Sequence, residues 1–320
     1  MRTVAQRALA VTGQGSNHAR AAPVDHAAAE PDGRSVRWPA RPRDIALRLT
    51  ALALLLRPMG PWFVRPALLA LPVLMILSPA LLRSALAWGA IAILVAVRIA
   101  DDWPLADNHI YLLGYWALAI ALSLRVPDGE AALAFSSRWL IGLAFVFAVL
   151  WKAVLSPDFL DGRFFRVTLL TDPRFGDAAQ LMGGLSARQL ADNRTALEVL
   201  PAGAELLVPP TIDEPARLRW LAVAATWGIL ALESAVAITM LLPGTAIRTT
   251  FRHVALLLFC GTTYLFAPVA GFGWLLLAMG AGQLDETQVG FRRAYLAAFL
   301  VVIFYGEIPW AELALKLGAG

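Results

Sequence analysis

The sequence predicts an all-α, polytopic transmembrane helical bundle of about seven or eight spans. Of its 320 residues, 59% are hydrophobic and only 16% are charged, whereas soluble domains carry about 25% charged residues. Apolar runs of roughly 20 residues, the length that crosses a bilayer, recur along most of the chain. These runs are continuous rather than alternating, so we expect helices, which satisfy their backbone groups within lipid.

The charges favour a membrane surface, not nucleic acid, as the partner. The formal net charge is +4, but nearly all the cations are arginines spread over the tails and helix ends, where they can meet lipid head groups. We therefore expect membrane lipids, and a partner membrane protein in one hypothesis, as partners. The single Cys260 excludes an intrachain disulfide. The Ala- and Arg-rich composition is typical of bacteria, so a bacterial inner membrane is the expected location.

The chain begins with a predicted disordered, basic tail, residues 1–44, that is poor in bulky apolar side chains. Residues 45–320 form the predicted transmembrane domain. Its first apolar run, 45–57, is too short to span and is flanked by Arg48 and Arg57. An interfacial amphipathic helix is expected there.

Candidate spans follow this run at intervals along the chain. Pro72 and Pro79 should kink the first of them, and the glycine-rich stretch 267–282 could be a span, a half-span or a re-entrant segment. The candidates are 64–83, 84–100, 108–125, 138–155, 217–242, 252–268, 269–284 and 292–313.

One sizeable polar insertion, residues 156–216, interrupts the apolar pattern. It has mixed charge and turn sequences such as "TDPRFGD". Its roughly 60 residues are enough for a small cap of interfacial helices but not for a large independent domain.

Ionisable side chains at membrane depth cost at least about 2.5 kcal/mol each near the bilayer centre, so they mark the candidate site. In "WPLADNHIYLLGYW", residues 103–116, Asp107 or Asn108 can cap a helix start. His109 then either lies in the first turn near the interface without a functional role, or faces the bundle as a base or quinone-binding group. Trp116 lies on the same helix face, seven residues later.

Lys152 and Glu233 are the other two candidate catalytic residues. Lys152 lies at the end of an apolar run, where it can snorkel to the interface or act as a partly buried base, with Asp158 and Asp161 as counter-ions. Glu233 lies in the middle of "WLAVAATWGILALESAVAITMLL" and needs a partner or a proton. It could equally be a structural pair or a neutral, hydrogen-bonded acid.

A polar stripe of His253, Cys260 and Tyr264 occupies one face of a later helix, at i, i+7 and i+11. This stripe should point into the bundle, either for helix–helix hydrogen bonding or as ligand-binding groups together with Asn108 and Trp116. No metal site is expected, and no motif for phosphate binding, zinc binding or a serine nucleophile is present.

Three stretches resemble the transmembrane domain of the vitamin K-dependent gamma-carboxylases and their bacterial horizontally transferred transmembrane (HTTM) relatives. "ADNHIYLLGYWALAIALSL" resembles the Asn-His-Tyr-Tyr-Leu helix start of that family, and "WLIGLAFVFAVLWKAVLSPDFLDGRFF" resembles its helix ending in Lys-Leu-x-x-Asp-Trp-x-x-Gly. "LESAVAITMLLPGTAIR", with "FRHVALLLF" after it, resembles its Glu-bearing and His-bearing helices. The similarity covers about 105–285.

The resemblance implies a helical domain that can host a reduced quinone as cofactor, and a base. Two departures limit what it implies about the reaction. The catalytic lysine of the family falls where Val154 stands, two residues after Lys152, and Phe159 replaces the Trp. Because the chain also ends at residue 320 without a large extramembrane domain, carboxylase activity is not expected.

Three functions remain in competition. In the first, His109, Glu233, His253 and Lys152 line one intramembrane pocket that binds a quinone-like lipid and does acid–base chemistry. In the second, the chain is a non-enzymatic membrane subunit or scaffold, and the same groups hold its helices together. In the third, it is a small transporter with Glu233 as a proton or cation site.

Overall fold

The structure, a computed structural model, describes residues 41–198, 211–243, 246–266, 269–308, 313–314 and 316–317. Within these ranges every regular element is a helix, as the sequence predicts. The predicted tail lies outside the described residues except at its end, where residues 42–44 already belong to the first helix. Part of the polar insertion, 199–210, also lies outside them.

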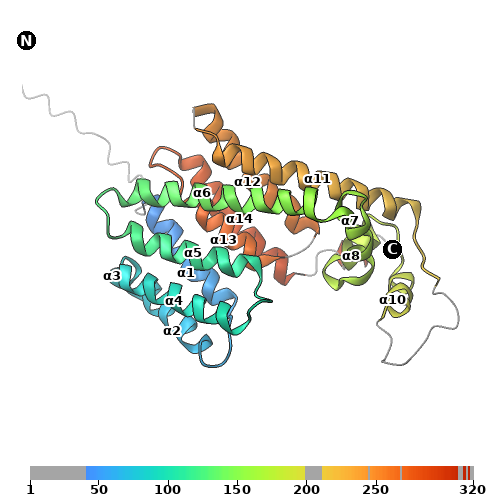
Figure 1. The fold of residues 1–320 in the computed structure, drawn as a ribbon, viewed down its shortest axis with the longest axis horizontal. Coiled ribbons are helices and arrows are strands. Elements are labelled where there is room, and N and C mark those ends of the chain that lie inside the picture. The colour runs from blue at the N-terminus through green and yellow to red at the C-terminus, as the bar shows by residue number, and fades with distance from the viewer. Residues whose placement is uncertain are drawn as a thin grey trace, which may run out of the picture. The chain divides into compact units, whose positions relative to one another are not determined.

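Each of the predicted apolar segments contains a helix (Figure 1). Pro72 lies inside α2 without ending it, and the chain instead breaks at Ser78, before Pro79, because a residue preceding proline avoids the helical region. The elements are α2 (Arg65–Leu77) with α3 (Pro79–Leu82), α4 (Ala85–Asp101), α5 (Asn108–Ser123), α6 (Gly129–Leu150) continued by the π-helix η1 (Trp151–Leu155), α11 (Ala216–Leu241), α12 (Ala246–Phe266), α13 (Ala270–Ala281) and α14 (Val289–Glu307).

The helix α1 (Pro42–Leu56) belongs to the core, so the expectation of an interfacial helix at 45–57 was wrong. Ala46, Leu47 and Ala51 are fully buried, and α1 packs against α2 and α13. Its apolar side chains cover too much of its circumference for a helix lying on a surface. At its start Asp44, with a side chain only 3% exposed, pairs with Arg83 at 2.5 Å.

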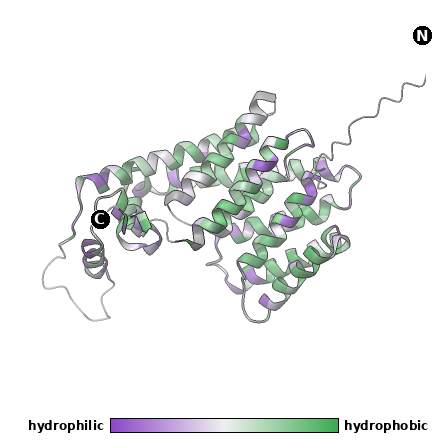
Figure 2. Ribbon diagram, turned by 180° about the vertical axis from the view of Figure 1, so that it is seen from behind, coloured by the Kyte–Doolittle hydropathy of each residue, from purple (hydrophilic) through white to green (hydrophobic). Residues whose placement is uncertain are grey.

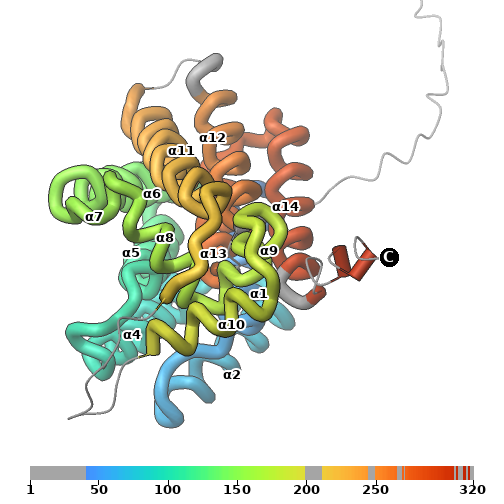
Figure 3. Tube along the Cα trace, turned by 90° about the vertical axis from the view of Figure 1, so that its right-hand side faces the viewer, coloured from blue at the N-terminus to red at the C-terminus, as the bar shows by residue number. Residues whose placement is uncertain are grey.

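The centre of the bundle is α13, which contacts α1, α5, α6, α12 and α14 (Figure 3). Residues 273–281 are buried around the whole helix, as expected for a helix that is hydrophobic on every face. With 12 residues, α13 is only about 18 Å long at 1.5 Å per residue. This is shorter than the roughly 20 residues that a full span needs.

The two longest helical segments pack against each other. The continuous helix Gly129–Leu155 (α6 with η1) and α11 have 27 and 26 residues, and each is apolar and long enough to cross a membrane. Gly142 of α6 faces Leu241 of α11, whereas the start of η1 faces an earlier part of α11 through Lys152 and Glu233. The two helices therefore run antiparallel.

The polar insertion forms a small cap of short helices, as predicted: α7 (Pro157–Leu160), α8 (Arg163–Thr171), η2 (Pro173–Phe175), α9 (Gly176–Leu181) and α10 (Ala187–Ala196). Leu169, Leu170 and Leu190 form its own core with Leu218 at the start of α11. Ser186 and Gln189 close a capping box at the start of α10. Hydrogen bonds from Arg174 hold the pKa of Asp172 below its usual range.

The contact between α6 and α11 yields a first prediction. A Cβ added at Gly142 would lie 2.6 Å from Cδ2 and 2.8 Å from Cγ of Leu241, so G142A must push the two helices apart. We expect it to lower the free energy of unfolding by about 1–3 kcal/mol, measured by thermal unfolding of the detergent-purified protein. G228A is the matched control, because a Cβ at Gly228 of α11 meets no atom within 4 Å and alanine favours a helix by about 1 kcal/mol. Equal shifts in the two variants would contradict the prediction.

Candidate functional site

Two of the three candidate catalytic residues form an ion pair. Lys152 Nζ donates a hydrogen bond to Glu233 Oε1, and the two side chains are 22% and 7% exposed. The ammonium also lies 5.6 Å from the ring centre of Phe159, within cation–π range. The partner that Glu233 requires is thus Lys152, which is 81 positions away in the chain.

The π-helix η1 sets the direction of Lys152. In this wider turn Lys152 faces α11, whereas Trp151 and Val154 are more than 60% exposed. Short π-helical turns inside α-helices are frequent at functional sites. Asp158 and Asp161, expected as counter-ions of Lys152, instead bind Arg163, at 2.7 and 3.1 Å, because the chain turns away into the insertion after Ser156.

Glu233 keeps one free acceptor. Its Oε2 is buried and has no hydrogen-bond partner among the described residues. Thr226 lies on the same face of α11, seven residues earlier, but its hydroxyl donates to the Ala222 carbonyl at 2.9 Å instead. A buried carboxylate oxygen without a donor costs free energy, so this atom is a candidate point of ligand contact.

The stripe of His253, Cys260 and Tyr264 faces into the bundle, as predicted, with each side chain at most 5% exposed. His253 Nδ1 shares a hydrogen bond with the Tyr295 hydroxyl at 3.0 Å, and its ring lies 4.9 Å from that of Phe291. Tyr264 donates to the Val269 carbonyl at 2.5 Å, at the turn before α13. The stripe is therefore engaged in helix–helix contacts.

His109 lies apart from both of these groups. Asp107 occupies the N-cap position of α5 but makes no side-chain capping hydrogen bond, because its carboxylate turns toward His109, 3.7 Å from Nε2. Asn108 is the first residue of the helix and is exposed. The expectation that one of these side chains caps the helix was therefore wrong. Trp116 is fully buried and donates to Thr50 Oγ1 at 2.9 Å.

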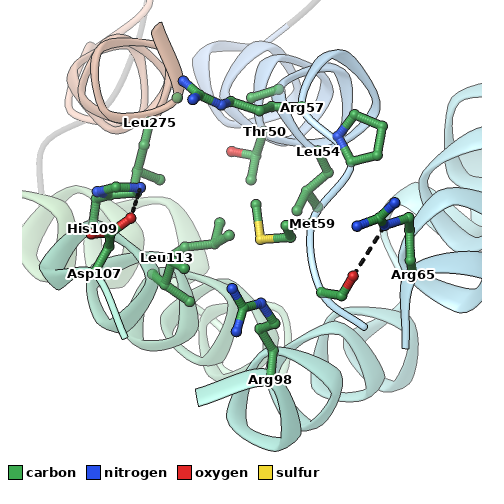
Figure 4. A pocket seen from close by; sticks show the side chains of 15 residues that line it. Thr50, Leu54, Arg57, Met59, Arg65, Arg98, Asp107, His109, Leu113 and Leu275 are labelled. Atoms are coloured by element: carbon green, nitrogen blue, oxygen red, sulfur yellow. Dashed lines mark hydrogen bonds and ion pairs between the residues drawn. The ribbon is translucent and has the colours of Figure 1, made fainter. Parts of the chain in front are cut away.

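A cavity of about 270 Å³ opens beside His109 (Figure 4). It lies where α1, α2, α4, α5 and α13 begin or end, and three arginines of its lining were not predicted as site residues. Their positions at helix ends suggested contacts with lipid head groups and gave no sign that they converge. The lining comprises Thr50, Ala53, Leu54, Arg57, Pro58, Met59, Gly60, Arg65, Arg98, Asp107, His109, Ile110, Leu113, Gly271 and Leu275.

The candidate residues thus form three separate groups. Lys152, Glu233 and His253 are not among the residues that line the cavity beside His109. The expected meeting of these side chains around one shared pocket is not found there. Among the described residues no cluster of histidine, cysteine or acidic side chains suits a metal ion.

The sequence matches no protein-family model, and comparisons with curated proteins and with solved structures find no match.

Breaking the Lys152–Glu233 pair on one side should destabilise the protein strongly. K152M leaves a buried carboxylate without its counter-charge, and we expect a loss of about 3 kcal/mol in the free energy of unfolding. The double variant K152M/E233L removes both charges and should recover most of that loss. A double-mutant cycle in detergent measures the coupling, and additive losses would show that the two charges do not stabilise each other.

Removing the Tyr295 hydroxyl should also destabilise the bundle, because His253 Nδ1 then has no partner in a fully buried site. We expect Y295F to cost about 1–3 kcal/mol in thermal unfolding. Y115F removes a hydroxyl from a side chain that is 60% exposed and should have little effect. If Y115F costs as much as Y295F, the hydrogen bond is not what stabilises His253.

Proposed function

We propose that the chain is a multi-pass integral membrane protein of the HTTM and gamma-carboxylase-like type, in which Lys152 and Glu233 do acid–base chemistry on a lipid-soluble ligand. One observation carries this proposal. Among the described residues, the two helices that are long and apolar enough to cross a membrane are joined by an ion pair whose carboxylate is buried, and ionisable groups inside membranes are by default functional.

The surface of these two helices supports a membrane setting. In their most apolar windows only 28% and 33% of residues are buried, and Phe147 and Trp227 are more than half exposed. The core helix of a soluble protein would be mostly buried, and large exposed apolar surfaces mark contact with membranes or proteins. Hydrophobic residues run along the lengths of the helices (Figure 2). We propose that α2–α3, α4, α5, α12 and α14 are further spans and that α13 is a buried half-span.

The pair offers a donor and an acceptor at the same place. The Lys152 ammonium balances the carboxylate and can donate, and Glu233 Oε2 is open to accept. A reduced quinone fits this set, because it carries hydroxyl groups on a flat apolar ring that can lie near Phe159. Such a ligand would supply the protons and electrons of the reaction. Glu233 would hold a hydroxyl proton at Oε2, and Lys152 would orient the carboxylate.

A scaffold without enzymatic activity is the second candidate. The pairing of Lys152 with Glu233 and of His253 with Tyr295 favours it, because both pairs connect helices that are distant in the chain. The two functions differ in what the free acceptor of Glu233 does. An enzyme uses it to bind a ligand, whereas a scaffold does not.

Quinone analysis of the purified full-length protein separates these functions. We expect quinone to be extracted from the wild type in a fixed ratio, and added short-chain menaquinol to raise its unfolding temperature. E233Q should lower both responses at least tenfold, whereas K152R keeps the charge and should retain part of them. E214Q is the matched control, because Glu214 forms an ion pair with Arg166 in the insertion. If the wild type carries no quinone and menaquinol leaves its stability unchanged, the scaffold is the better description.

A further inference from the structure

The cavity beside His109 has a lining with excess positive charge. Arg57, Arg65 and Arg98 reach it from three different elements, while Asp107 is the one carboxylate of the lining. We propose that this cavity binds a phosphate group. A phosphate is an anion with several acceptor oxygens, and guanidinium groups match it with paired hydrogen bonds.

The arginines are held in place by the fold. Arg65 Nε donates to the Gly60 carbonyl at 3.0 Å, and Arg98, whose side chain is 17% exposed, pairs with Asp102. The side chain of Arg57 rests on α13, because a Cβ at Gly271 would lie 3.2 Å from Arg57 Cδ. Figure 4 shows the three guanidinium groups and His109 around a common space. A ligand there meets donors that are already arranged, which reduces the entropy cost of binding.

The acids near the cavity neutralise only part of its positive charge. Asp102 pairs with Arg98, and Asp107 faces His109. Arg57 has no ion-pair partner within the part of the chain that the structure describes. The excess charge favours an anion over a neutral ring.

Two helix ends add to this preference. Gly271, in the first turn of α13, lines the cavity, and α5 begins there without a side-chain cap. The amino end of a helix carries a partial positive charge and free N–H groups that bind anions. Half-helices that end inside a membrane protein point this end at anionic ligands.

The size and the apolar side of the cavity suit a phosphate attached to a larger molecule. Its 270 Å³ corresponds to about nine waters of 30 Å³ each, which is more than a bare phosphate needs. Leu54, Met59 and Leu275 line the rest of it. The phosphate could belong to a lipid head group or be free in solution, and the experiment below distinguishes these sources. The proposal is independent of the chemistry at Lys152 and Glu233.

The test uses the full-length protein in maltoside detergent and phosphate-free buffer, so that no phosphate group is present before a probe is added. In the first arm, phosphatidylglycerol is added, bound lipid is counted by native mass spectrometry, and the unfolding temperature is followed. In the second arm, inorganic phosphate is titrated into the same detergent solution without lipid. We expect R57Q to weaken binding about tenfold, the equivalent of one charge-assisted contact. R57K keeps the charge but loses the planar donor pair, so its loss should be smaller.

Arg48 provides the matched control, because it is exposed on the same helix but does not line the cavity. R48Q should leave binding unchanged. A response to phosphatidylglycerol that R57Q weakens identifies a lipid phosphate as the ligand, and a response to inorganic phosphate alone identifies a free phosphate. The proposal is overturned if neither probe binds, or if R48Q weakens binding as much as R57Q, because the effect then comes from general surface charge.

Discussion

The burial of α13 on all its sides is the constraint on which the rest of the bundle depends. A helix surrounded by α1, α5, α6, α12 and α14 must be apolar around its whole circumference, and residues 274–279, Trp-Leu-Leu-Leu-Ala-Met, meet that demand. Its neighbours must then supply every contact. This explains why α1, which looks like a surface helix by length and flanking charges, is buried: one of its faces is the wall against which α13 packs.

The same helix explains why the polar groups are divided. An apolar helix in the centre keeps the polar side chains of the surrounding helices from meeting there, so the pairs form between neighbouring helices instead. Lys152 pairs with Glu233 across the contact of η1 with α11, and His253 with Tyr295 across α12 and α14. His109 remains at the end of the bundle where α13 begins. A buried charge without a partner costs several kcal/mol, and this separation avoids that cost without a common pocket.

The sequence allowed the helices to be predicted but not most of the contacts between them. Continuous apolar runs located each long helix, whereas Pro79, which was expected to kink a span, instead begins a new helix after the break at Ser78. Glu233 was known to need a partner, yet no local pattern connects it to Lys152, because a π-helical turn decides which way the lysine points. Arg57, Arg65 and Arg98 were missed for a similar reason. The sequence around an arginine at a helix end is the same whether its side chain contacts lipid or lines a cavity. Only the packing of five helices distinguishes these two positions.

The shortness of α13 has a consequence for biosynthesis if the chain spans a membrane as proposed. A segment of 12 residues is too short for the translocation machinery to release into lipid as an independent span, which takes about 20. It must therefore reach its place after its neighbours have inserted, by docking between them as the bundle closes. The newly made chain then passes through a state in which this apolar helix is still outside the bundle. Chaperones or membrane proteases can bind the exposed helix in that state.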